Sequence, residues 1–496
     1  MSRTQTLKLA RKWHLLLVWP AMLSVLVYVL SSLAHPVANW LGPAKARFQP
    51  PSLHADAKAV NSIASIIKHN RLGAAHIAKL VPYEDRVLLQ VTQGSGQEQS
   101  RRYFSTQDYS ELAEHDRQQA IWLAQQYVLG QPKVKFVEYI SEFNDAYPKS
   151  QRLLPVYKIH YQTADNLSAI VHTESLALVS LSNDGKRLLK SLFRMLHTFD
   201  WLNEYETVRL IVIAVLLSLL LIMSLSACYF LLVMKRQRVI KLRARRWHRR
   251  LAYVVVLPLF LFSVSGFYHL GQASLYSHDE NLNLQDALDL SQWQAPMVMA
   301  AELAPLSWNQ VSLVQAAGPV YRLQAARAGK PSHGMPSGPA KHDAPVYFLD
   351  AHGSQLAHYT DSALIHKKLA NWFAIGADDV VNQQMLHGFE QGYSFKNKRL
   401  PVWKFELLNT HRNHVFIDPV SHRVLATNNP LTRLEGYSFS YLHMWGFLKP
   451  VLGHSGRDVI FVLLLVLTLV LSLFGLRVHL AAKRRTQATA GRQQPA

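Results

Sequence analysis

Four apolar stretches constrain this chain more than any other feature of its sequence. Each is long enough for a helix to cross the hydrocarbon core of a bilayer, which is about 30 Å thick. They cover residues 15–34, 210–234, 251–270 and 459–476. Only 17% of the 496 residues are charged, whereas ordinary soluble domains have about 25%. The sequence therefore predicts a membrane protein with four transmembrane helices that contact membrane lipid.

The basic residues predict how these helices are oriented. The net charge is +21, and it is concentrated in residues 1–14, 235–250 and 477–496, each next to an apolar stretch. A net charge of this size is typical of nucleic-acid-binding proteins, but its confinement to these three segments argues against a nucleic-acid partner. Because short basic segments stay in the cytoplasm, both termini and the 235–250 loop are expected there.

This orientation divides the chain into nine segments. The two longest, 35–206 and 271–456, are expected to be exported domains on the other side of the membrane. The remaining segments are the cytoplasmic N-terminus 1–14, helix 15–34, helix 207–234, the basic loop 235–250, helix 251–270, helix 457–480 and the cytoplasmic tail 481–496. The end of the first helix, Ser32-Leu33-Ala34, loosely fits a signal-peptidase site. That helix is therefore either a cleaved signal peptide or, as its length favours, an uncleaved anchor.

Both exported segments have the pattern of mixed α+β domains. Apolar residues recur at helical spacing in 57–69, 111–129 and 362–373. Alternating or continuous apolar runs predict strands at 86–91, 134–140, 156–161, 176–181, 311–314, 320–325, 346–349, 402–407 and 414–417. Asn183-Asp184-Gly185 predicts a turn, and residues 329–345 predict a flexible loop because they are rich in proline and glycine.

Histidine spacing marks an internal repeat. The first and third apolar stretches both follow a basic-basic-Trp-His sequence, and in each a second histidine follows 21 residues after the first. In the exported segments, residues 154–159 resemble residues 400–405, and a Leu-His pair follows each motif at the same distance. These matches predict two halves of one design, each with a span, an exported domain, a histidine and a second span, as in membrane proteins built from parallel repeats. The paired histidines are His14 with His248, His35 with His269, and His197 with His443.

The paired histidines are the candidate cofactor ligands. His14 and His248 lie at the cytoplasmic ends of their spans, the other two pairs lie at the outer side, and His479 follows the fourth span on the inner side. Neutral imidazoles on facing helices of a bundle can hold a haem iron from both sides. Twenty-one residues of helix extend roughly 31 Å, so separate pairs can serve an inner and an outer site. The alternative is that interfacial histidines simply favour the headgroup region.

The single cysteine, Cys228, limits the cofactor chemistry. One cysteine excludes a disulfide framework, a zinc finger and a cysteine-ligated iron–sulfur cluster within this chain. Without a Cys-x-x-Cys-His motif, any haem is non-covalent and b-type. The sequence also lacks the glycine-rich nucleotide motifs, so the chain is expected to receive electrons rather than to take hydride itself. No residue is singled out as catalytic.

These motifs resemble those of the PepSY-associated transmembrane family, and among its members the inner-membrane ferric-siderophore reductases. The matching span starts are Arg-Lys-Trp-His14 and Arg-Arg-Trp-His248, and the matching Leu-His pairs are those of His197 and His443. Ser263-Val264-Ser265-Gly266, late in the third span, is a further match.

The second exported segment is similar to the end of a PepSY module. There, residues 400–405 together with 416–425 are similar to the part of the module in which Asp-Pro and a turn connect two strands. Asp418 and Pro419 are the Asp-Pro pair of this chain. Two departures affect this match. His422 stands where the family usually has glycine, and the first exported segment contains no Asp-Pro.

The resemblance implies four transmembrane helices in two repeats with two exported α+β, PepSY-like domains, in a bacterial inner membrane, and two haem b groups. Electrons from a quinol or a cytoplasmic reductase would reach an inner haem, pass to an outer haem, and reduce a ferric siderophore or other ferric chelate in the periplasm. Reduction would release the iron because Fe(II) is softer and less charged than Fe(III).

Two questions stay open at this point. For the inner site we expect His14 with His248, and for the outer site we rank His197 with His443 ahead of His35 with His269. The chain is either such a reductase, a non-enzymatic haem- or metal-binding accessory protein of iron uptake, or a cofactor-free PepSY regulatory membrane protein.

Overall fold

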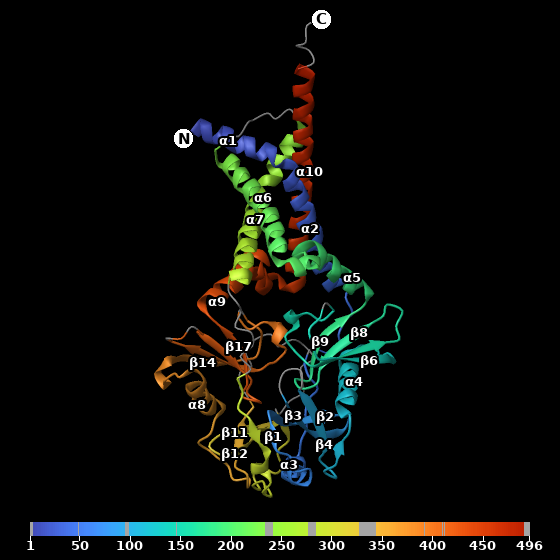
Figure 1. Ribbon diagram of the computed structural model, residues 1–496, viewed down its shortest axis with the longest axis vertical. Coiled ribbons are helices and arrows are strands. Elements are labelled where there is room, and N and C mark those ends of the chain that lie inside the picture. Colours follow the sequence, from blue (N-terminus) through green and yellow to red (C-terminus); the bar gives the residue numbers. More distant parts are fainter. Residues whose placement is uncertain are drawn as a thin grey trace. The chain divides into compact units, whose positions relative to one another are not determined.

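A computed structural model describes residues 3–47, 49–94, 99–144, 146–233, 242–275, 284–326, 344–390, 392–408, 410 and 412–490. The chain forms two compact units (Figure 1). The helical unit comprises Met1–Gly42, Asp184–His278 and Leu431–Ala496, and the sheet unit comprises Pro43–Asn183 and Asp279–Pro430. Most of the proline- and glycine-rich loop 329–345 and the first part of the basic loop 235–250 lie outside the described residues.

Within the described residues, the helical unit contains four helices that are long and apolar enough to cross a membrane, in agreement with the four predicted spans. Its α-helices are α1 (Arg3–Leu16), α2 (Val18–Trp40), α5 (Asp184–Phe193), α6 (Glu206–Val233), α7 (Arg243–Leu275), α9 (Pro430–Tyr437) and α10 (Lys449–Ala490). Two short π-helical segments, Arg194–Thr198 and Ser438–His443, lie before α6 and α10. α10 is kinked at Gly453, whose positive φ of 68° a side chain would strain.

The first predicted span and the predicted turn at Asn183-Asp184-Gly185 both differ from the structure. The first span is interrupted at Leu17, and α2 then continues through Pro36 to Trp40, beyond the expected end at residue 34. Asp184 does not form a turn but begins α5. Its carboxylate lies in the first helical turn, where the helix dipole favours a negative charge, and it accepts a hydrogen bond from Arg187 at 2.6 Å. Helical periodicity after residue 184 therefore overrides the Asn-Asp-Gly turn signal.

The described residues of the sheet unit contain three α-helices and a strand at each of the nine ranges that the sequence predicts, together with eight further strands. The helices are α3 (Ala57–His69), α4 (His115–Tyr127) and α8 (Asp361–Phe373). The strands are β1 (Ala74–Ala75), β2 (Ile77–Tyr83), β3 (Arg86–Gln93), β4 (Ser100–Ser105), β5 (Glu111–Leu112), β6 (Val134–Ile140), β7 (Val156–Tyr161), β8 (Ser168–His172), β9 (Ala177–Ser182), β10 (Leu288–Asp289), β11 (Trp308–Gln315), β12 (Pro319–Ala325), β13 (Val346–Leu349), β14 (Val380–Leu386), β15 (Val402–Leu407), β16 (His414–Ile417) and β17 (Val424–Asn428). The helix expected at 111–129 is shorter, because its first residues form β5.

One seven-stranded sheet combines strands from both of the long segments that the sequence separates. Its order is β13-β12-β11-β2-β3-β4-β5, and the central antiparallel pair places Ser312 of β11 opposite Lys79 of β2. A buried core on this sheet contains residues of both segments: Leu89 and Phe104 from the first and Trp308 from the second. The pairing of β2 with β11 removes two exposed sheet edges, which would otherwise carry unpaired backbone groups.

Two four-stranded sheets complete the sheet unit. Their orders are β6-β7-β8-β9 and β14-β15-β16-β17. The first strand of each sheet, β6 or β14, shifts its register with the neighbouring strand after its first residue. Helix α4 buries its apolar face on the first sheet and α8 on the second. Each of these two sheets therefore packs against the helix that precedes it in the chain.

The Asp-Pro turn of the second half has a counterpart of different chemistry in the first half. In the second half, Asp418 accepts a hydrogen bond from Ser421 at 2.7 Å, and His422 adopts a left-handed φ of 51°. In the first half, His172 contacts Ser175 at 2.7 Å, and Leu176 adopts a left-handed φ of 53°. His172 and Thr173 thus stand where the other half has Asp-Pro, which explains how the turn forms without that motif.

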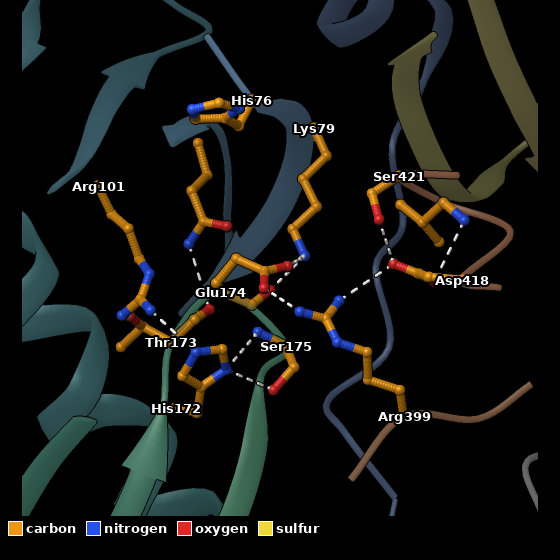
Figure 2. A network of polar contacts seen from close by, with 12 residues as sticks. His76, Lys79, Arg101, His172, Thr173, Glu174, Ser175, Arg399, Asp418 and Ser421 are labelled. Atoms are coloured by element: carbon orange, nitrogen blue, oxygen red, sulfur yellow. Dashed lines mark hydrogen bonds and ion pairs between the residues drawn. The ribbon is translucent and has the colours of Figure 1, made fainter. Parts of the chain in front are cut away.

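A buried cluster of charged residues joins the two long segments (Figure 2). Glu174, in the turn between β8 and β9, accepts hydrogen bonds from Lys79 of β2 and from Arg399, which precedes β15. Arg399 also pairs with Asp418 at 3.1 Å. Beside them, Arg101 donates to His172 at 2.9 Å. The Glu174 side chain is only 1% exposed, so its charge is compensated by partners rather than by water.

Candidate functional site

The helical unit brings His197 and His443 together. Their ring centroids are 6.3 Å apart, and the ring planes are nearly perpendicular at 83°. Each histidine lies in one of the two π-helical segments. Each ring also stacks on a phenylalanine four residues earlier, Phe193 at 4.6 Å and Phe439 at 5.1 Å. The two imidazoles therefore occupy matching environments.

A serine from another helix holds each of these rings. The Nδ1 atom of His197 is 3.0 Å from the hydroxyl of Ser31 in α2, and the Nδ1 atom of His443 is 3.1 Å from that of Ser265 in α7. Each hydroxyl donates its only proton to a backbone carbonyl three residues earlier in its own helix. Because the hydroxyl proton is engaged, each serine oxygen accepts a hydrogen bond from Nδ1–H. The lone pair of the imidazole is then on Nε2.

His14 has the same arrangement at another place in the bundle. Its Nδ1 atom is 2.8 Å from the hydroxyl of Ser226 in α6, and this hydroxyl donates to the carbonyl of Met223 at 2.9 Å. The ring of His14 lies edge-on to Phe230, with centroids 5.4 Å apart. Nδ1 again carries the proton, and Nε2 carries the lone pair.

His248 reaches the same state with a backbone acceptor. Its Nδ1–H donates to the carbonyl of Leu471 in α10 at 3.0 Å. A glycine makes this approach possible: a Cβ atom on Gly475 would lie 2.9 Å from Cε1 of His248, which is too close for a side chain.

The other three predicted ligands have different surroundings. His269 contacts the carboxylate of Glu435 through Nδ1 at 2.5 Å, and its side chain is 55% exposed. His35 lies edge-on to Phe193 at 6.5 Å and is exposed. His479 is half-buried in α10. These three therefore lack the Nδ1 hydrogen bond to a serine or to a backbone carbonyl that the first four share.

The four anchored imidazoles have the donor chemistry that haem requires. An imidazole that ligates a metal usually donates its other N–H to a protein acceptor, and within the described part of the chain no hydrogen bond reaches Nε2 of His14, His197, His248 or His443. The 6.3 Å separation of the His197 and His443 rings matches two metal–nitrogen bonds of about 2 Å plus roughly 1 Å from nitrogen to ring centre on each side.

The ligand sets available are pairs rather than clusters. Among the residues that the structure describes, no three His, Cys, Asp or Glu side chains gather as a group that could hold a metal ion. A pair of imidazoles suits haem, because the porphyrin supplies the other four ligands of the iron. The donor set therefore fits haem better than a bare metal ion.

The family profile of the PepSY-associated TM region matches residues 11–387. The chain belongs to the PepSY-associated transmembrane family. The match begins at the Arg-Lys-Trp-His sequence of His14 and includes His197 and His248, whereas His443 lies beyond its end. Comparison with curated proteins and with solved structures gives no match.

In this PepSY-associated membrane protein, the sequence did not single out three residues that contact the histidines. They are Ser31 beside His197, Ser226 beside His14 and Gly475 beside His248. Ser265 belongs to the Ser-Val-Ser-Gly motif, but its contact with His443 was not expected. One signal was present in the sequence: Ser31 follows His14 at the same distance as Ser265 follows His248. The contacts themselves join residues far apart in the chain, and only the packing of the helices reveals them.

Proposed function

We propose that this PepSY-associated membrane protein is a haem-containing reductase of the bacterial inner membrane, which passes electrons to ferric siderophores or other ferric chelates in the periplasm so that iron is released. The observation that carries the proposal is the set of four imidazoles with Nδ1 anchored and Nε2 open, two of them with ring centroids 6.3 Å apart. Family membership supports the membrane location.

In this proposal His197 with His443 would hold one haem b, and His14 with His248 would hold a second. Haem supplies one-electron transfer when it is bound. The protein residues hold the imidazoles in one tautomer and separate the two sites along the bundle. Leu220, Val29 and Leu465, from three different helices, form an apolar core within that bundle.

The substrate side of the proposal rests on the chemistry of iron. Siderophores bind Fe(III) through hard oxygen donors, and Fe(II) is bound less tightly because it is softer and less charged. A one-electron transfer to the chelate therefore weakens binding without breaking the chelator. A quinol or a cytoplasmic reductase is proposed as the electron donor.

The first experiment is an absorption spectrum of the purified full-length protein, oxidised and then reduced with dithionite. The proposal predicts the spectrum of low-spin, bis-histidine haem b at two haems per chain. Single changes of His14, His248, His197 and His443 to Ala should each lower the haem content. Unchanged haem in all four variants would contradict the ligand assignment and direct attention to His35, His269 and His479.

The second experiment tests the reaction. Dithionite-reduced protein should be reoxidised by a ferric siderophore and much more slowly by the same chelator loaded with gallium. Ga(III) has nearly the size and charge of Fe(III) but does not accept an electron, so the comparison separates electron transfer from binding. Haem that is not reoxidised by any ferric chelate would favour a non-enzymatic accessory protein. A stable, colourless preparation would favour a PepSY regulatory protein without a cofactor.

A further inference from the structure

We infer that Ser31, Ser226 and Ser265 are positioning residues, which select the Nδ1–H tautomer of His197, His14 and His443 and so leave Nε2 as the ligating nitrogen. The inference rests on the proposed function for the identity of the ligand. It adds three residues and a physical role for each. It follows from a contact geometry that recurs three times in the bundle.

The serines are unusual because each hydroxyl serves two partners. A serine inside an apolar helix normally satisfies itself by donating to the carbonyl three or four residues earlier. Ser31, Ser226 and Ser265 do this, at 3.1, 2.9 and 3.1 Å. Each then uses its oxygen lone pair for a histidine on another segment. The second contact is not needed by the serine, so it benefits the histidine.

The histidine needs the contact for two reasons. A buried N–H without an acceptor costs about 1–3 kcal/mol, and this cost would favour the other tautomer or a rotated ring. The acceptor also makes the imidazole a stronger electron donor, since a hydrogen bond from Nδ1–H shifts electron density toward Nε2. A stronger donor stabilises Fe(III) relative to Fe(II). Loss of the serine oxygen should therefore raise the reduction potential and weaken haem binding.

The bundle supplies a matched control for each serine. Ser24 in α2, Ser224 in α6 and Ser263 in α7 are as buried as the positioning serines, with exposures of 0%, 1% and 1%. Each donates to a carbonyl of its own helix, at 3.2, 2.9 and 2.8 Å. Within the described residues none of them contacts a histidine. A serine-to-alanine change at these sites removes the same atom and the same backbone contact without touching an imidazole.

The experiment compares single alanine variants of the full-length, haem-loaded protein by redox titration and haem content. Ser31→Ala, Ser226→Ala and Ser265→Ala should each raise one midpoint potential and lower haem affinity by about tenfold. A tenfold preferential loss from the ferric form corresponds to ~59 mV for one electron. Ser24→Ala, Ser224→Ala and Ser263→Ala should leave both potentials unchanged. Threonine at the three positioning sites keeps the hydroxyl and should restore the wild-type potentials.

Equal shifts in the two sets of variants, or no shift in a protein that holds haem, would overturn the inference while leaving the proposed function intact. A wild-type protein that holds no haem would instead contradict the proposed function. In that case, ¹⁵N spectra of histidine-labelled protein decide the positioning role directly. Nδ1-protonated His197 that becomes a tautomer mixture in Ser31→Ala supports it, and a mixture already present in the wild type refutes it.

Discussion

Glu174→Gln is the substitution that most directly tests how the two long segments are held together. The Glu174 carboxylate is 1% exposed and is shared between Lys79 and Arg399, whose side chains are 11% and 8% exposed. Removing one partner of a buried ion pair costs about 3–5 kcal/mol, because the remaining charge loses its compensation. Two contacts survive the change: Lys79 still reaches the Glu174 backbone carbonyl, and Arg399 still pairs with Asp418. We therefore expect a loss near the lower end, about 3 kcal/mol.

The expected loss is large against the 5–15 kcal/mol that is typical of a folded domain. For a unit of this size it corresponds to a decrease in Tm of roughly 6–12 °C. The measurement is urea unfolding of the full-length protein in detergent, followed by hydrogen exchange of β8 and β15, with the helical unit as internal reference. Glu138→Gln is the control, since Glu138 is 45% exposed and pairs with Lys158 at 3.4 Å. An exposed pair of this kind is worth about 0–1 kcal/mol.

The pH dependence gives an independent check. Burial alone raises the pKa of Glu174, but Arg399 and Lys79 outweigh that effect and hold the pKa well below its usual range. A carboxylate with a depressed folded-state pKa contributes stability that is complete above its unfolded pKa of about 4.3 and is lost as the pH falls toward the folded pKa. The difference between wild type and Glu174→Gln should therefore be constant from pH 7 to about 5 and shrink below about 4. A variant as stable as the wild type at pH 7, or a difference that grows in acid, would refute the reasoning.

Three further predictions concern other parts of the molecule. Gly475→Ala should lower haem occupancy, because the added Cβ would lie 2.9 Å from His248. Gly271→Ala is the control and should not lower it, because no atom lies within 4 Å of its added Cβ. The haem-to-protein ratio of each purified variant measures the effect. Asp361→Asn should destabilise the sheet unit by about 3–5 kcal/mol, because Arg322 forms two 2.7 Å hydrogen bonds to that carboxylate. Burial raises the pKa of Asp361, but Arg322 outweighs burial and lowers it. The stability that this ion pair contributes is therefore present at pH 7 and is lost in acid. Calorimetry of wild type and variant at two pH values measures this loss. Reporter fusions after residues 190 and 430 should report the periplasm and one at residue 240 the cytoplasm; a periplasmic signal at 240 would end the four-span topology.

Several elements were predictable because local burial determines them. The helix Ala57–His69 and the strands Val134–Ile140, Val156–Tyr161 and Val402–Leu407 have the predicted bounds, since one face of each packs on a core and the apolar period reports that face. Short signals were less reliable. The Asn-Asp-Gly turn gave way to helix α5, because a helix of ten residues with an acidic first turn outweighs three turn-forming residues.

The histidine candidates show the same limit at the level of the site. Spacing identified six paired histidines, to which His479 was added for its place after the fourth span, and their order of preference followed position alone. The structure separates His14, His197, His248 and His443, which share an Nδ1 hydrogen bond to a serine or a carbonyl, from three that do not. Those acceptors lie between 166 and 223 residues away in the chain. No local pattern encodes such a distance, because the contact depends on which helices pack together.

The sequence by itself determined the membrane class, the four spans, the family and the paired histidines, since each depends on composition, period or spacing along the chain. Only the tertiary structure decided that strands β2 and β11 pair to join the two long segments in one sheet. It also brings the Glu174 carboxylate to Arg399, more than 200 residues away in the chain. The absence of a side chain at Gly475 lets the His248 ring reach the Leu471 carbonyl. The physical reason is common to all three: sheet edges, buried charges and close packing are satisfied by whichever partner the fold brings into contact.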